Sequence, residues 1–281
     1  MTKRRHSITD IGPWSEVKLA IIREYAAAYS VILSKQARLR HVYIDAFAGA
    51  GIHQSRTTGN LVLGSPSVAL MTHPPFTAYH FIDLDGGNIE TLRGLLTSGT
   101  VGDVDLSCVR LYNADCNEVL LSEVLPTVRY QDYRRALCLL DPYGLDLDWR
   151  VVEEAGRMKS VELFLNFPIA DMNRNVLLRD TTKVDPHQAE RMTRFWGDES
   201  WRDAAYCRTE NLFGFEEKQT NEDMVRAYQK RLKLVAGFKH VPEPMPMRNT
   251  KGAVVYYLFF ASPNPVATNI VEAIFSKYGA A

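Results

Sequence analysis

The sequence predicts an α/β fold built on a mostly parallel β-sheet with helices on both faces. Five short apolar runs are spaced along the chain, and most of them end at an acidic residue. A segment with helical periodicity follows most runs, and such an alternation of strands and helices is typical of a parallel sheet. An almost wholly apolar run, 254–261, fits a last strand inserted antiparallel into this sheet. The five runs lie at 42–44, 79–83, 108–112, 136–140 and 162–166.

The first run leads into a glycine-rich turn, Asp45-Ala46-Phe47-Ala48-Gly49-Ala50-Gly51. Gly49 and Gly51 let the backbone turn sharply and approach a ligand with no Cβ in the way. The D-x-F-x-G-x-G pattern suits S-adenosylmethionine, with Asp45 ordering the turn and Phe47 beside the cofactor. A nicotinamide dinucleotide site would need a third glycine or alanine where this chain has Gln54. A plain strand-turn-helix connection is the alternative.

The second run ends in Ile82-Asp83-Leu84-Asp85. Asp83 closes the strand where a carboxylate that binds the ribose would lie. Its distance in sequence from the glycine turn exceeds the usual twenty or so residues, since a polar loop is expected at 52–63 before a helix at Ser65. Asp85 is the competing candidate, and its other interpretation is an N-cap for the following helix.

The third run is followed by Asn113-Ala114-Asp115. Asp115 could accept a hydrogen bond from an adenine amino group. With Glu118 three residues later it fits half of a capping box equally well, and the sequence leaves both interpretations open.

The fourth run ends in Asp141-Pro142-Tyr143-Gly144, and the sequence places the chemistry here. A carboxylate at the carboxyl end of a central parallel strand points into the ligand crevice. The carboxylate of Asp141 and the backbone carbonyl of Pro142 could accept from the N–H groups of an exocyclic amine. Tyr143 could then stack on a planar substrate. A strand-ending turn is the alternative, because Asp-Pro and Tyr-Gly are turn dipeptides.

These motifs resemble a class I S-adenosylmethionine-dependent methyltransferase, and D-P-Y-G resembles the D-P-P-Y signature of amino-methylating nucleic-acid enzymes with the second proline missing. Over almost its whole length the chain is similar to the three-Cys-motif partner family (TcmP). The matching pieces are Trp14-x-x-x-Lys18-Leu19 with Tyr25, Tyr43-Ile44-Asp45-x-Phe47-Ala48-Gly49-x-Gly51, Gly64-Ser65-Pro66, Phe81-Ile82-Asp83, Asp141-Pro142-Tyr143-Gly144, and Asn166-Phe167-Pro168 followed by Asn173-Arg174. The resemblance implies a Rossmann-like methyltransferase fold and a radical-type partner protein that bears three cysteines.

The rest of the chain fits one domain spanning 1–281. Apolar residues at three- and four-residue steps predict an amphipathic N-terminal helix over about 13–37. After the fifth run the alternation breaks, and helical stretches predict an insertion over about 171–235. Asn166 and Arg174 are weaker candidates on the substrate side, because a strand-end amide and a surface arginine explain them equally well.

Composition indicates a cytoplasmic protein without a structural metal. Lysine plus arginine equals aspartate plus glutamate at 33 each, so net charge gives no general attraction to nucleic acid. No apolar run is long enough to span a bilayer, and the first residues lack the apolar core of a signal peptide. The four cysteines and seven histidines show no ligand spacing, so buried free thiols are expected.

Two functions follow as expectations. The first is a methyltransferase that uses S-adenosylmethionine to methylate an amino group of a nucleobase or nucleoside. The second is a cofactor-binding subunit that serves the three-cysteine partner without catalysing transfer.

Overall fold

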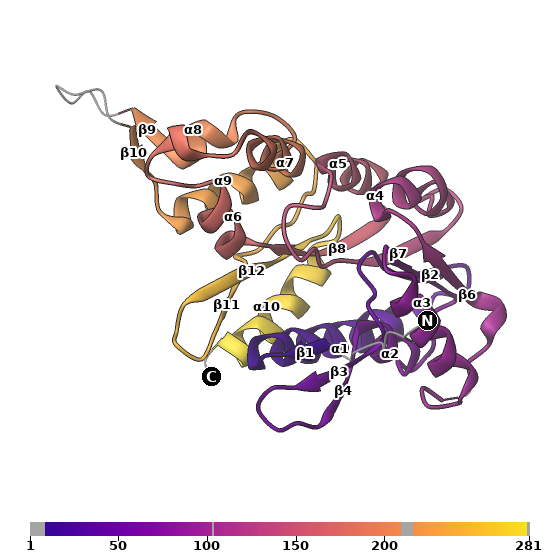
Figure 1. The fold of residues 1–281 in the computed structure, drawn as a ribbon. Helices are drawn as coiled ribbons and strands as arrows, with labels where there is room; N and C mark the ends of the chain where they lie inside the picture. The colour runs from indigo at the N-terminus through magenta and orange to yellow at the C-terminus, as the bar shows by residue number, and fades with distance from the viewer. Residues whose placement is uncertain (1–8, 103, 209–215, 280–281) are drawn as a thin grey trace.

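The computed structural model describes residues 9–102, 104–208 and 216–279, and its centre is a seven-stranded sheet. Figure 1 shows this sheet between two layers of helices. In spatial order the strands are β11 (Met245–Arg248), β12 (Val254–Ala261), β8 (Val161–Phe167), β7 (Arg134–Leu140), β2 (Arg40–Asp45), β5 (Ala78–Asp83) and β6 (Val109–Asn113).

The strand directions confirm the expected mostly parallel sheet. The five strands from β8 to β6 pair in parallel, whereas β12 pairs antiparallel with both β8 and β11. The sequence therefore identified the antiparallel member correctly. Because β12 runs the opposite way, its first residues lie at the edge of the sheet where the parallel strands end.

Two apolar cores fill the space above and below the sheet, since successive side chains of a strand point to opposite faces. In β2, Val42 and Ile44 join one core and Tyr43 joins the other. One face is covered by α1 (Pro13–Ser34), α2 (Ser65–Leu70), α3 (Gly86–Thr97) and α10 (Pro265–Gly279). The other is covered by α4 (Cys116–Val119), α5 (Trp149–Met158), α6 (Ile169–Asn175), α7 (Pro186–Trp196), α8 (Trp201–Ala205) and α9 (Asn221–Leu234).

The segment 52–63, expected as a polar loop, is instead a hairpin, and that expectation was wrong. β3 (Ile52–Ser55) pairs antiparallel with β4 (Leu61–Leu63), and β1 (Thr9–Ile11) adds a third strand parallel to β3. The pairing partner β1 lies about 40 residues earlier in the chain, so no local pattern indicated it. As a result the segment before α1 is fixed beside the glycine turn.

The segment after β8, where a helical insertion is expected over about 171–235, is not wholly helical. It contains α6 to α9, but it also contains strands β9 (Tyr206–Arg208) and β10 (Glu216–Lys218), and residues 209–215 lie outside the described part. Short turns of helix complete the described fold: η1 (Leu106–Cys108), η2 (Leu120–Val124), η3 (Leu125–Thr127) and η4 (Thr181–Lys183).

Smaller expectations were adjusted at particular residues. The N-terminal helix ends at Ser34 rather than near residue 37, and α2 begins at Ser65 as expected, with Gly64 as its N-cap. All four cysteines are free, but Cys207 is exposed and Cys108 half-buried, so only the other two are buried thiols. Within the described ranges no helix is long and apolar enough to cross a membrane.

Two helical glycines give a matched test of this packing. A Cβ on Gly156 in α5 would lie 2.0 Å from the carbonyl oxygen of Ala236, whereas one on Gly94 in α3 would meet nothing within 4 Å. We expect Gly156→Ala to lower the free energy of unfolding by about 3 kcal/mol, because backbone must move to admit the methyl group. Gly94→Ala should raise it by about 0.5–1 kcal/mol through helix propensity. Urea unfolding of both variants measures these free energies. An unchanged free energy of unfolding for Gly156→Ala would mean that α5 does not pack closely against the backbone at Ala236.

Candidate cofactor and substrate site

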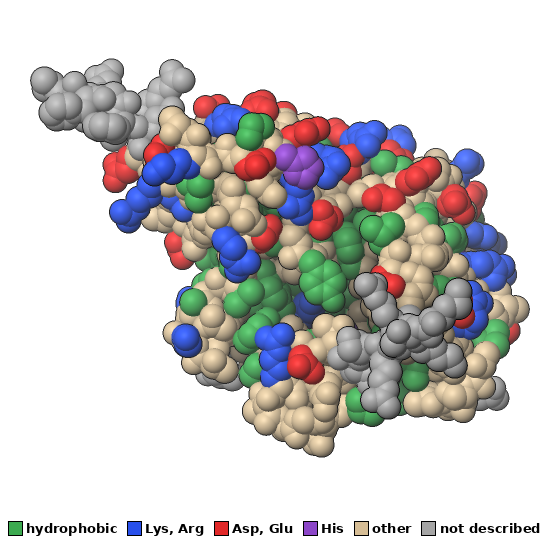
Figure 2. All heavy atoms as spheres, viewed as in Figure 1, with side chains coloured by type: hydrophobic (Ala, Val, Ile, Leu, Met, Phe, Trp, Pro, Cys, Tyr) green, Lys and Arg blue, Asp and Glu red, His purple; other side chains and the backbone are tan. Residues whose placement is uncertain are grey.

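A cavity of about 300 Å³ opens at the carboxyl ends of β2, β7 and β8. Its walls come from these strand ends, the starts of α1 and β12, the β1 and β3 segments, and α6. Figure 2 shows the surface hollowed between the layer that carries α6 and the layer that carries α1, with hydrophobic side chains on the wall. In open α/β sheets, this edge is where ligands bind.

The glycine turn after β2 forms one wall of the cavity. Gly49 has a positive φ of 61°, and a Cβ placed there would meet only His53, at 3.9 Å. The backbone N–H of Gly49 donates to Asp83 Oδ2 at 2.8 Å. Phe47, Ala48 and Gly49 all line the cavity. The turn therefore presents bare backbone to the cavity, and Asp83 holds it in place.

Asp83 and Gly51 lie behind this wall and are not among the residues that line the cavity. Besides Gly49, the Asp83 carboxylate accepts from the Asp85 backbone N–H at 2.8 Å and the Asn88 side chain at 3.2 Å. A Cβ on Gly51 would lie 2.8 Å from the Leu92 side chain, so this glycine is needed for close packing against α3.

Asp45 ends β2 and is fully buried. Its Oδ1 accepts weakly from the Phe47 backbone N–H at 3.4 Å, and the Ser65 side chain lies near the carboxylate. Burial raises the pKa of Asp45 to about 7, and the negative charge of Asp141 adds to this, against the opposing effect of the Ser65 hydroxyl.

Asp141 lines the cavity at the end of β7, and both of its oxygens are engaged. Its Oδ2 forms an ion pair with Lys18 Nζ, and its Oδ1 accepts from Asn166 Nδ2 at 3.0 Å. Asn166 also donates to the carbonyl oxygen of Pro142 at 3.3 Å. The end of β8 thus fixes both of the acceptor groups that the sequence assigned to an amine. Each oxygen retains a further lone pair for a ligand.

Lys18 is the site residue that sequence reasoning missed. It projects from α1 into the cavity wall, is only 7% exposed, and lies 5.4 Å above the centre of the Tyr256 ring. Burial by itself would lower the pKa of Lys18, but the charge of Asp141, its hydrogen bond to Lys18 and the nearby Tyr256 and Asp45 together raise the pKa above its ordinary value. The available signal was a lysine on the apolar face of an amphipathic helix, four residues after Trp14 and three before Ile21.

The outer part of the cavity carries the remaining substrate-side candidates. Tyr143 is 82% exposed at its edge, where its ring is free to stack, and Arg174 of α6 also lines the cavity. Two buried acceptor atoms of the wall have no partner among the described residues: Asn166 Oδ1 and Asp171 Oδ2. Burying an acceptor unpaired is costly, so these atoms fit a ligand that donates N–H groups.

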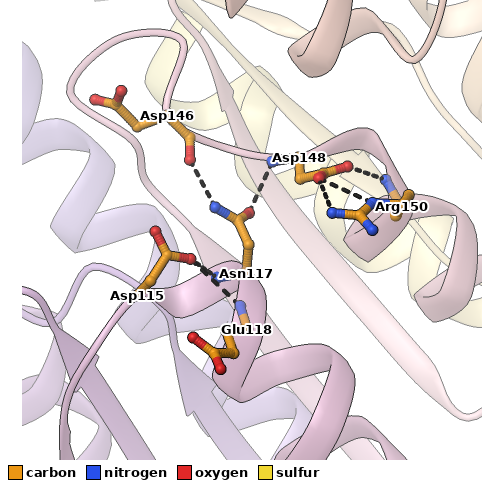
Figure 3. A network of polar contacts seen from close by, with 6 residues as sticks. All are labelled: Asp115, Asn117, Glu118, Asp146, Asp148 and Arg150. Carbon is orange, nitrogen blue, oxygen red and sulfur yellow. Dashed lines mark hydrogen bonds and ion pairs between the residues drawn. The ribbon is translucent and has the colours of Figure 1, made fainter.

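Asp115 lies apart from this cavity. Figure 3 shows its carboxylate at the start of α4, where Oδ1 accepts from the backbone N–H groups of Asn117 and Glu118 at 2.8 and 3.3 Å. The N-cap interpretation of Asp115 is thus confirmed, and so is that of Asp85, which caps α3. The side chain of Asn117 then bridges to the backbone of Asp146 and Asp148, which anchors the loop that follows Gly144.

Known structures share this fold at low sequence identity. A Legionella pneumophila strain Philadelphia 1 protein of family model DUF519 has 8% identity and a TM-score of 0.51, covering 93% of this chain and 92% of its own. The methyltransferase domain of bacterial CtHen1 has 10% identity and a TM-score of 0.41, covering 86% and 99%. The METTL16 MTase domain also has 10% identity and a TM-score of 0.41, covering 85% and 66%.

These likenesses concern the fold alone. No protein-family model matches the chain, and no curated protein matches it. The similarity to the TcmP family therefore stays a prediction from sequence, and function must be inferred from the residues of the site.

Proposed function

We propose that this protein is an S-adenosylmethionine-dependent methyltransferase that acts on an amino group of a nucleobase or nucleoside. The observation that carries the proposal is the meeting of the Gly49 turn and the Asp141-Pro142 acceptors in one cavity. The two motifs are 92 residues apart in the sequence, yet both line the same cavity. A pair of ordinary strand-ending turns would not need unpaired buried acceptors around a shared cavity.

The cavity fits the cofactor on two counts. The bare backbone at Gly49 leaves room that a side chain would fill, and the unpaired acceptors suit N–H donors. Phe47 and Gly49 would contact the cofactor, while Asp45, Gly51 and Asp83 would hold the turn. When bound, S-adenosylmethionine supplies an electrophilic methyl group.

The chain's own part in transfer would be to hold the amine. The Asp141 carboxylate and the Pro142 carbonyl would accept its two N–H groups and so aim the nitrogen lone pair into the cavity. Lys18 and Asn166 fix the carboxylate in this orientation. Tyr143 would stack on the base, and Arg174 would contact the outer part of the substrate.

One observation favours the alternative, a cofactor-binding subunit that serves a three-cysteine radical-type partner. Asp141 and Pro142 already accept from Lys18 and Asn166, so an amine would have to share these acceptors. The missing second proline of the D-P-P-Y pattern points the same way. Incubation with labelled cofactor and nucleic acids, nucleosides or cell extract, with and without the partner, separates the two. Methylated product supports the enzyme, and bound cofactor without any product supports the subunit.

Cofactor binding has its own matched test. Gly49→Val should bring S-adenosylmethionine binding below detection at about 1 mM ligand, because a β-branched residue is strained at positive φ and its side chain would enter the cavity. Gly59→Val is the control, since Gly59 has a φ of 71° on the β3–β4 hairpin and does not line the cavity. Isothermal titration calorimetry measures both. Undetectable binding by the unaltered protein would exclude both proposed functions.

A further inference from the structure

A second cavity, of about 310 Å³, lies at the other edge of the large sheet, where β7 and β8 begin and β12 has just ended. It is therefore separate from the candidate site, although α1 contributes to both. Its volume is at the lower end of the range for small-molecule sites. Apolar side chains of α1 and α10 form much of its wall: Ile32, Leu33, Val266, Ala267 and Ile270.

Buried polar groups lie in the deep part of this cavity. The hydroxyl of Tyr29 has no hydrogen-bond partner in the described structure, and its side chain is 6% exposed. Burial keeps the pKa of Tyr29 well above its ordinary value, so the hydroxyl remains a donor. Beside it Glu162 accepts from the hydroxyls of Tyr25 and Ser262. A buried hydroxyl left without a partner is costly, and a ligand oxygen would remove that cost.

The more exposed part of the cavity carries positive charge. Arg135 and Lys159 line it, and neither forms an ion pair with any of the residues described. The Arg135 guanidinium lies 3.7 Å from the centre of the Tyr130 ring, and its Nη1 donates to the Arg134 carbonyl oxygen at 2.7 Å. Glu162 is the remaining charged group of the lining, and burial raises its pKa to about 7, so its negative charge is reduced near neutral pH.

We propose that this second cavity binds a small organic carboxylate with an aromatic or branched apolar body. The apolar body would lie against α1 and α10, and the carboxylate would pair with Arg135 and Lys159. A hydroxyl at the far end of the ligand would meet Tyr29 and Glu162. This inference does not depend on the methyltransferase proposal, because it concerns a different cavity and is tested by binding alone.

The test compares two probes with the same ring and opposite charge, 4-hydroxyphenylacetate and tyramine, by saturation-transfer NMR and calorimetry on the full chain. We expect the carboxylate to bind with a Kd of about 1–5 mM, as its size allows, and tyramine to bind more weakly. Arg135→Gln should raise the Kd of the carboxylate probe about tenfold, because a charge-assisted hydrogen bond is lost.

Two tryptophan variants locate the probe. Val266→Trp adds a bulky ring at a half-exposed position of the cavity wall and should abolish binding. Val31→Trp is its control. Val31, on α1, is a partly exposed valine like Val266, but it does not line the cavity. Tighter binding of tyramine would overturn the ligand class. Binding that survives Val266→Trp, or no binding of the carboxylate to the unaltered protein, would overturn the site.

Discussion

Asp141→Ala is expected to lower methyl transfer by a factor on the order of a hundred or more while cofactor affinity changes little. Asp141 and the Pro142 carbonyl are the acceptors proposed to orient the amine, whereas the cofactor would contact the Gly49 turn on another part of the wall. Removing the carboxylate therefore misplaces the reacting nitrogen, but it leaves the Gly49 turn that would contact the cofactor unchanged. Single-turnover transfer and calorimetric binding of S-adenosylmethionine, measured on one folded preparation, separate these two effects.

Asp146→Ala is the matched control for this prediction. Asp146 is a carboxylate in the same connection, five residues later, but it pairs with Arg191 and does not line the cavity. Its loss should leave transfer within a fewfold of the unaltered protein. Transfer by Asp141→Ala at the unaltered rate would show that Asp141-Pro142-Tyr143-Gly144 is only a strand-ending turn.

Lys18→Met is expected to lower the free energy of unfolding by about 3 kcal/mol, although a methionine fits the apolar surroundings. The side chains of Lys18 and Asp141 are 9% and 23% exposed, so removing either charge leaves the other largely buried and uncompensated. Removing both should cost much less than the sum of the single changes. A double-mutant cycle of Lys18→Met and Asp141→Ala, followed by urea unfolding, should give a coupling energy of about 2 kcal/mol.

The exposed pair Arg157–Glu154 on α5 provides the comparison. Its side chains are 73% and 30% exposed, and the same cycle there should give a coupling energy below about 1 kcal/mol. A coupling between Lys18 and Asp141 as small as this would mean that the pair is not held together in solution. The proposed role of Lys18 in fixing Asp141 would then fail.

Much of the fold could be predicted from the sequence because its signals are local. Runs of β-favouring residues such as Val42-Tyr43-Ile44 had to be buried strands, and the acidic or asparagine residue that closes each run marked where a strand ends. Parallel strands bring their carboxyl ends to one edge, so the Gly49 turn and Asp141 were expected to meet. The capping interpretations of Asp85 and Asp115 were also present in the sequence, since an N-cap acts within its own helix.

The chain alone thus determined the α/β fold, the antiparallel position of β12 and the edge of the sheet that carries the site. The tertiary structure decided which residues that are far apart in the sequence contact one another. It paired Lys18 with Asp141, 123 residues later, and set β1 beside β3. It also set Asp83 behind Gly49 and Gly51 against α3. The physical reason is that a buried charge or a close backbone approach depends on the partner opposite, and that partner comes from a segment whose position is fixed only when the two cores pack.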